Sequence, residues 1–316
     1  MDILDCLIIG GGPAGLNAAV VLGRCRRSVL VFDTEKYRNR WSHGMHNYLT
    51  RDHIPPSEFL QLCQPELEKY GIRVVKKQIV RAARNEEGLF EAFDQDGKCY
   101  LSRKLLVATG LKDNLPTLPG FEELYGKSVH HCPYCDGWEW QDQRLAVYAK
   151  SKDGSELCLA LMNTWSDKVT YFTDGNRNIK GATREYLEAS GIRIITEPVQ
   201  GLEGTDGLLK GVRMKNGELI EMDALFFVNG FTQQCNLAEA FGCAVGRKGA
   251  VITNRSQQTN ITGLYVAGDA SRDMHFVVVA AAEGAKAAVN INKELIKESA
   301  EKKRTKLKED KGEMAA

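Results

Sequence analysis

The chain has 316 residues, which exceeds the size at which a single hydrophobic core stops growing, so two domains are expected. Hydrophobic residues make up 43% and charged residues 26%, and a net charge of +1 argues against nucleic acid or a membrane surface as a partner. Nine cysteines, mostly far apart in sequence, do not form the pattern of a secreted disulfide framework and favour a reducing cytoplasm.

The N-terminal segment predicts a β-α-β unit. Residues 3–9 are an apolar run typical of a buried parallel strand, the glycine-rich stretch after it opens a helix, and residues 28–33 form a second apolar strand. Asp2 and Asp5 occupy positions where a signal peptide would carry positive charge, so we interpret this segment as the start of the fold. No apolar run reaches the roughly 18 residues needed to span a bilayer.

The rest of the chain continues this alternation of helices and strands. Helices are expected over residues 57–70, 154–165, 183–191 and 276–296. Strands are expected over residues 89–93, 98–101, 103–110, 144–149, 168–172 and 192–196, in a hairpin about Asn216 and Gly217, and over the strand and turn at 263–270. The prolines in 115–120 indicate a linker. This order predicts an α/β domain that is interrupted by a second domain and completed by the C-terminal segment.

The C-terminal residues 297–316 are rich in lysine and glutamate. We expect a frayed helix end that leads into a flexible charged tail. A docking arm for an acidic partner is the alternative interpretation.

A dinucleotide-binding motif follows the first strand. Gly10 permits a tight turn, Gly12 lets the backbone approach a pyrophosphate, and Gly15 allows close packing of helix on strand; Pro13 and Ala14 complete the motif. Asp33 ends the second strand, where a carboxylate can accept a hydrogen bond from a ribose hydroxyl.

Two other strands also end in glycine, and in an open parallel sheet ligands bind at the carboxyl ends of strands. The first pair is Thr109 and Gly110, and the second is Gly268 and Asp269. We expect both pairs to converge with the first motif on one ligand, with the carboxylate of Asp269 near a ribityl or ribose hydroxyl.

The segment from His131 to Glu139 contains Cys132 and Cys135, followed directly by Asp136. A structural zinc site needs four ligands, and the chain has no second CxxC, so no metal site is predicted here. A CxxC can form a redox disulfide with a lowered thiolate pKa, and Asp136 would then donate or accept the proton. Two inert buried thiols are the remaining alternative.

In the order and spacing of these motifs, the chain resembles the low-molecular-weight thioredoxin reductase family of flavoproteins over about residues 1–296. The resemblance implies an α/β fold of two Rossmann-like (three-layer ββα) nucleotide-binding domains, the second inserted in the first. It implies an FAD-binding domain (1–116 and 245–296), an inserted redox domain (117–244), and a homodimer. Cys135 would exchange electrons with the flavin and Cys132 with an external disulfide, and Asn47 would contact the flavin.

The chain departs from this family where NADPH would bind. Ala149, Ser151 and Gly154 occupy the second glycine motif, and Asp174 lies where a basic cluster would pair the 2′-phosphate. A Cβ at the turn and a carboxylate near the phosphate would both disfavour NADPH. His275 aligns with a segment near the flavin and is a candidate for proton transfer.

The sequence therefore predicts a cytoplasmic FAD-dependent thiol–disulfide oxidoreductase whose electron donor is not NADPH. A ferredoxin-like protein, or a second flavin in the vacated nucleotide cleft, is the expected donor, and a thioredoxin-like protein or a small disulfide or dithiol is the expected substrate. One alternative is a dithiol oxidase that passes electrons to O₂. A non-enzymatic flavin-binding redox sensor is the other.

Overall fold

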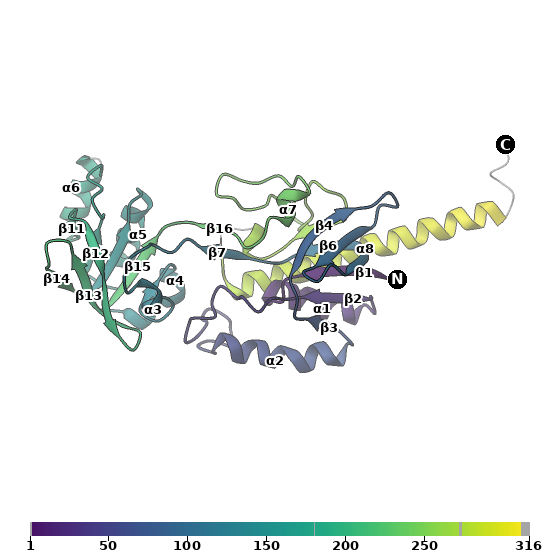
Figure 1. Ribbon diagram of the computed structural model, residues 1–316, viewed down its shortest axis with the longest axis horizontal. Coiled ribbons are helices and arrows are strands. Elements are labelled where there is room, and N and C mark those ends of the chain that lie inside the picture. Colours follow the sequence, from purple (N-terminus) through teal and green to yellow (C-terminus); the bar gives the residue numbers. More distant parts are fainter. Residues whose placement is uncertain (1, 180, 272–273, 311–316) are drawn as a thin grey trace. The chain divides into compact units, whose positions relative to one another are not determined.

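The computed structural model describes residues 2–179, 181–271 and 274–310, and its elements divide between two compact units (Figure 1). Unit 1 comprises Met1–Tyr37, Ser57–Lys112 and Gln233–Ala316, and unit 2 comprises Arg38–Pro56 and Asp113–Thr232. The chain passes between the two units after residues 112 and 232, earlier than the expected boundaries at 116 and 244. Residues 38–56 also pack with unit 2, although they were expected in the first domain.

Unit 1 is built on a seven-stranded sheet in which β6 (Cys99–Val107) is central. One edge of β6 pairs in parallel with β1 (Ile3–Ile9). On its other edge, β5 (Phe90–Asp94) pairs antiparallel with its first half, and β17 (Leu264–Val266) pairs in parallel with its last residues. The sheet is completed by β2 (Val29–Phe32), β3 (Arg73–Val75) and β4 (Ile79–Arg84). The two strands expected at 98–101 and 103–110 are therefore one strand.

Helices accompany this sheet, and the tightest helix contact in unit 1 depends on a glycine. A Cβ at Gly284 of α8 (Val277–Asp310) would lie 2.0 Å from the carbonyl oxygen of Ala14 in α1 (Pro13–Arg24), so only glycine allows the two helices to approach this closely. The remaining elements of the unit are α2 (Pro56–Lys69), α7 (Leu237–Ala240) and the 3-10 turn η2 (Asp269–Ser271). A two-stranded sheet of β7 (Leu111–Asp113) and β16 (Phe231–Gln233) contains two of the points where the chain crosses between units.

Helix α8 continues well beyond the expected end at residue 296, so the prediction of a flexible tail is wrong for residues 297–310. The segment contains no glycine or proline, and lysine and glutamate are good helix formers. Lys104, buried in β6, pairs with Glu294 at 2.6 Å and with Glu298 at 2.7 Å, which fixes the helix past the expected end. Residues 311–316 lie outside the described part of the chain.

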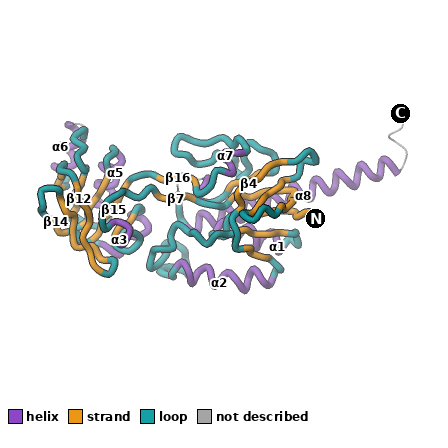
Figure 2. Tube along the Cα trace, in the orientation of Figure 1, coloured by secondary structure: helices purple, strands orange, loops and turns teal. Residues whose placement is uncertain are grey.

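Unit 2 contains a five-stranded parallel sheet in the order β11-β10-β9-β15-β8 and an antiparallel sheet of three strands. Figure 2 draws the strands in orange. The parallel strands are β8 (Val129–His130), β9 (Leu145–Ala149), β10 (Val169–Phe172), β11 (Arg193–Ile195) and β15 (Ala224–Val228). The antiparallel sheet contains β12 (Val199–Thr205), β13 (Leu208–Met214) and β14 (Leu219–Glu221), with the predicted turn at Asn216 and Gly217. The helices are α3 (Phe121–Leu124), α4 (Pro133–Asp136), α5 (Asp153–Thr164), α6 (Gly181–Ala189) and the 3-10 turn η1 (Trp138–Trp140).

Each unit therefore has its own sheet built on parallel strands, as expected for two Rossmann-like domains, and the sheet of unit 1 adds β4 and β5 in antiparallel pairing. In both, strands with continuous apolar sequence are fully buried: every residue of β2, β9 and β10 is buried. Among the helices of the described residues, none is long and apolar enough to cross a membrane.

Candidate functional site

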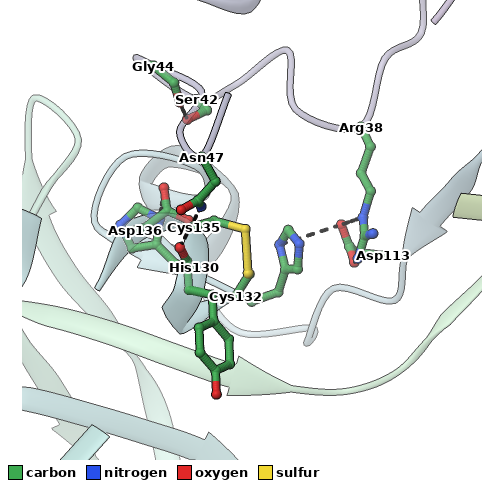
Figure 3. Close-up of a disulfide and its surroundings, with 11 residues drawn as sticks. Arg38, Ser42, Gly44, Asn47, Asp113, His130, Cys132, Cys135 and Asp136 are labelled. Atoms are coloured by element: carbon green, nitrogen blue, oxygen red, sulfur yellow. Dashed lines mark hydrogen bonds and ion pairs between the residues drawn. A yellow bond between two sulfur atoms is a disulfide. The ribbon is translucent and has the colours of Figure 1, made fainter. Parts of the chain in front are cut away.

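A disulfide joins Cys132 and Cys135 at the start of a short helix in unit 2 (Figure 3). Strand β8 ends just before it, and Pro133 takes the first position of α4, where its fixed φ favours helix initiation. The backbone N–H groups of Cys135 and Asp136 both donate to the carbonyl of Cys132 at 3.2 Å. This turn brings the Cα atoms of the two cysteines to 5.3 Å, within the range that a disulfide spans.

Asp136, the candidate acid–base group, lies at one end of a chain of three polar side chains in contact, of which Trp140 and His130 share a hydrogen bond. Nδ1 of His130 lies 3.3 Å from Oδ1 of Asp136, and the indole N–H of Trp140 donates to Nε2 of His130 at 2.9 Å. An indole N–H can only donate, so Nε2 accepts and the proton of the neutral imidazole is on Nδ1, facing Asp136. Trp140 therefore selects the tautomer of His130, and His130 orients the carboxylate of Asp136 next to the disulfide.

Arg38, Asp113 and Tyr125 form a second polar cluster, and all three precede Cys132 in the sequence. Arg38 donates to Asp113 through Nε at 2.8 Å and also through Nη2, and the hydroxyl of Tyr125 donates to the same carboxylate at 2.6 Å. Burial raises the pKa of Asp113, but these hydrogen bonds and the nearby positive charge outweigh it and lower the pKa to about 2. Asp113 is therefore ionised throughout the physiological range.

His131 lies next to this cluster, with Nδ1 3.9 Å from Oδ2 of Asp113. Burial and the charge of Arg38 lower the pKa of His131 to about 4. A positively charged His131 would favour the thiolate of Cys132, but burial and the guanidinium of Arg38 both disfavour the imidazolium form.

Aromatic side chains surround the disulfide but differ in exposure. Tyr134 is 66% exposed and Trp138 is 69% exposed, whereas Trp140 packs partly against the core of unit 2. The ring of Tyr134 meets Trp165 edge-on at 5.5 Å, and a Cβ at Gly137 would lie 2.8 Å from the Trp165 ring, so α4 rests closely on this tryptophan.

In unit 1 the first glycine motif has the geometry of a pyrophosphate cradle. A Cβ at Gly10 would lie 2.2 Å from the carbonyl oxygen of Ala108, and one at Gly15 would lie 1.9 Å from that of Gly10, so both positions require glycine. A Cβ at Gly12 would meet nothing within 4 Å, which leaves open space above the N-terminus of α1. The backbone is therefore close-packed at Gly10 and Gly15 and open at Gly12, as phosphate binding at a helix N-terminus requires.

The structure brings the three glycine segments together. Gly10 touches Ala108, directly before Thr109 and Gly110, and a Cβ at Gly268 would lie 3.0 Å from that of Ala14. The backbone N–H of Gly268 donates to Glu283 at 2.9 Å, so this amide is already bonded within the chain. Glu283 is a buried carboxylate of α8 that the sequence analysis missed, because nothing in the helix pattern marks it.

Two predicted ligand residues lie on this edge of the sheet. Asp33 is buried and accepts a hydrogen bond from the hydroxyl of Tyr37, and a Cβ at Gly11 would lie 2.7 Å from the Asp33 carboxylate. The carboxylate therefore lies against the glycine loop. Asp269 begins the turn η2 after β17. These glycines, the open space and the adjacent carboxylates fit a dinucleotide such as FAD.

In unit 2, the turn from β9 to α5 occupies the position of the second glycine motif, and its polar groups bond to one another. Asp174 accepts hydrogen bonds from the Tyr148 hydroxyl at 2.7 Å and from the Val199 backbone at 2.8 Å, and it pairs with Lys150 at 2.7 Å. Burial raises the pKa of Asp174, but its bonds to Lys150 and Tyr148 lower it overall. Helix α5 carries Asp153 and Glu156 in its first turn.

Two further predicted site residues remain less defined. Asn47, in the segment that packs with unit 2, has a positive φ of 63° and donates through Nδ2 to the carbonyl of Tyr134 at 2.9 Å. His275 lies just before α8 in unit 1 and is partly buried. A flavin contact for Asn47 and a proton-transfer role for His275 both stay predictions.

Comparison with known proteins extends these findings. The pyridine nucleotide-disulphide oxidoreductase family matches residues 4–284. Thioredoxin reductase tcpT of Claviceps purpurea (strain 20.1) is 33% identical over 278 residues, which cover 85% of this chain and 87% of tcpT. Among solved structures, TrxB from Bacillus anthracis superposes with a TM-score of 0.89 at 35% identity, covering 94% of this chain and 99% of TrxB. HlmI superposes with a TM-score of 0.93 at 32% identity, covering 98% of this chain and 97% of HlmI.

Proposed function

Since the chain belongs to the pyridine nucleotide-disulphide oxidoreductase family, we propose that it is an FAD-dependent thiol–disulfide oxidoreductase whose electron donor is not NADPH. The observation that carries this proposal is the Cys132–Cys135 disulfide with the oriented carboxylate of Asp136 in the same helical turn. The family implies FAD, and its proposed ligands are the glycine segments, Asp33 and Asp269 of unit 1. Bound FAD would supply the two-electron couple for the disulfide.

The residues of the chain have separate roles in this exchange. In the reductive direction, the thiolate of Cys132 attacks one sulfur of the substrate disulfide, forming a mixed disulfide and releasing the first substrate thiolate. The thiolate of Cys135 then attacks Sγ of Cys132, which releases the second substrate thiolate and closes the Cys132–Cys135 disulfide. Asp136 accepts and returns the proton at the departing or attacking sulfur, and His130 holds the carboxylate in position.

The turn after β9 supports a donor other than NADPH. A 2′-phosphate near Asp174 would meet a carboxylate, and the cation nearest to that position, Lys150, is already paired with the same carboxylate. A pyrophosphate at the N-terminus of α5 would meet Asp153 and Glu156, which weaken the attraction of the helix end for anions. We propose a ferredoxin-like protein, or a second flavin in this position, as the donor.

The proposed oxidising substrate is a thioredoxin-like protein, in line with the name of the similar tcpT, and the assembly is a homodimer. The exposed rings of Tyr134 and Trp138, one within the redox helix and one just after it, offer an apolar contact for such a partner. A cytoplasmic location agrees with the seven free cysteines.

A second candidate function, a dithiol oxidase that passes electrons to O₂, is favoured by a pocket in unit 2. This pocket has a volume of about 190 Å³ and is lined in part by Asp136, His130 and Trp140, so a small molecule can reach the proton-transfer group. A small dithiol would be oxidised to its disulfide by Cys132–Cys135, and the reduced cysteines would pass two electrons through the flavin to O₂, giving H₂O₂. This function also needs no nucleotide site.

Stopped-flow absorbance of the flavin separates these candidates. We expect dithiothreitol under argon to reduce the flavin in the wild type but not in Cys135→Ser, while NADPH and NADH in excess leave it oxidised. Rapid reduction by NADPH would refute the proposed donor, and equally fast reduction in Cys135→Ser would refute the role of the cysteine pair. Oxygen consumption with dithiols would favour the oxidase, and reduction of thioredoxin by a reduced ferredoxin would favour the reductase.

A further inference from the structure

Two histidines face each other across a loop of unit 2 that the proposed chemistry does not use. Residues Met45 and Ile54 form an antiparallel bridge, with N–H of Met45 donating to Ile54 at 2.8 Å and N–H of His53 donating to Met45 at 2.9 Å. This bridge brings His46 and His53 side by side, with ring centroids 5.2 Å apart. The backbone hydrogen bonds of this bridge therefore fix the spacing of His46 and His53.

A carboxylate completes this group from a different part of unit 2. Glu139 lies in η1, immediately after the redox helix, and its Oε1 is 3.4 Å from Nε2 of His46. One ligand atom from each of His46, His53 and Glu139 lies within 4.8 Å of the others. Two ligands about 2.1 Å from a zinc ion at the tetrahedral angle are separated by about 3.4 Å. The His46–Glu139 distance matches this value, and His53 lies near enough to approach both on binding an ion.

The other nitrogen of His46 has the partner that a metal-bound histidine normally has. Nδ1 of His46 lies 3.5 Å from Oδ1 of Asp52, and the same oxygen accepts the backbone N–H of Asn47 at 3.0 Å, which fixes the carboxylate. If Nδ1 donates to Asp52, Nε2 has no proton and its lone pair is directed at Glu139, another acceptor. A carboxylate–histidine–metal arrangement resolves this conflict with a cation between Nε2 and Oε1.

We propose that His46, His53 and Glu139 bind a divalent ion of the zinc class. Two histidines and one glutamate are the protein ligands of a known type of zinc centre that keeps a fourth position for water or a further ligand. All three residues line the pocket of about 190 Å³ that Asp136 also lines, so the fourth position is accessible from that pocket. The ion would join the loop of residues 38–56 to the segment that follows the redox helix.

The test uses metal-free, untagged full-length protein with Cys132–Cys135 oxidised, so that these thiols cannot bind the ion. Zinc binding is measured by competition with a chromophoric chelator, its stoichiometry by elemental analysis, and its geometry by the visible spectrum of the cobalt-substituted protein. We expect one ion per chain. His53→Ala and Glu139→Gln should each weaken zinc binding by at least about 100-fold, and Asp52→Asn should weaken it by about 10-fold.

Matched controls separate this site from adventitious binding. His43→Ala changes a histidine that lines the same pocket outside the cluster, and Cys25→Ser removes an exposed thiol; both should bind zinc like the wild type. Absence of stoichiometric binding in the wild type would overturn the proposal. Equal loss of affinity in His43→Ala and His53→Ala would overturn it as well. Because binding is measured without turnover, the result does not depend on the proposed redox function.

Discussion

Replacing Trp140 by phenylalanine tests whether the Trp140–His130–Asp136 chain positions the proposed proton-transfer group, Asp136. The substitution keeps an aromatic ring but removes the indole N–H that donates to Nε2 of His130. Without this donor, either nitrogen of the imidazole can carry the proton. In the wrong tautomer an unprotonated Nδ1 faces the carboxylate of Asp136, which must then rotate or lose its partner.

The expected magnitude follows from this one bond. A neutral hydrogen bond contributes about 0.5–1.5 kcal/mol, so thiol–disulfide exchange should slow by about 2- to 13-fold. The side chain of His130 is only 5% exposed, so its unpaired nitrogen should also lower the free energy of unfolding by roughly 1–3 kcal/mol. The exchange rate is measured by stopped flow with dithiothreitol under argon. Nitrogen-15 NMR of the imidazole reports the tautomer directly.

Trp138→Phe is the matched control, since Trp138 lies two residues before Trp140 and its side chain is 69% exposed. We expect the control to retain the wild-type exchange rate with dithiothreitol and the wild-type tautomer of His130. If Trp140→Phe also retains both, the indole does not select the tautomer, and the positioning of Asp136 must be explained in another way.

Two further predictions concern pH. Since burial and Arg38 lower the pKa of His131 from 6.5 to about 4, its contribution to stability is full above pH 6.5 and is lost as pH falls to 4. With screening by solvent, roughly 2 kcal/mol of the free energy of unfolding should disappear over this window in denaturant titrations, and His131→Gln should flatten the profile. Burial raises the pKa of Glu298, but Lys104 and Arg103 lower it overall, so Glu298→Gln should destabilise the protein by up to about 1 kcal/mol at pH 7, and this difference should disappear as pH falls below 4.5 through the lowered pKa. A constant difference from pH 3 to pH 7 would contradict this.

The parts of the fold and site that could be predicted are those with local causes. Apolar runs such as residues 144–149 form buried strands because parallel sheets are covered on both faces. Gly10 and Gly15 are marked in sequence because their packing admits no Cβ. The pairing of Cys132 with Cys135 needs only one helical turn.

The parts that could not be predicted depend on partners far apart in sequence. Asp113 is held by Arg38, 75 positions earlier, and neither residue has a local pattern that indicates the other. The same holds for the segment of residues 38–56, which packs with unit 2 although it lies between two elements of unit 1. The length of α8 was underestimated because the ion pairs of Lys104 with Glu294 and Glu298 are tertiary, whereas composition alone suggested a tail.

Two ion pairs in unit 2, Lys150 with Asp174 and Arg38 with Asp113, neutralise the charges nearest to the β9–α5 turn and to His131. Lys150 lies in the turn between β9 and α5, and its charge is matched by Asp174. Asp113 pairs with Arg38 beside His131; burial and Arg38 lower the pKa of His131, and Asp113 opposes this shift only in part. The charges nearest to both positions are therefore internally compensated. An anionic cofactor gains little attraction at the β9–α5 turn, and in the proposed mechanism the reactivity of Cys132 depends more on Asp136 and His130 than on a positive neighbour.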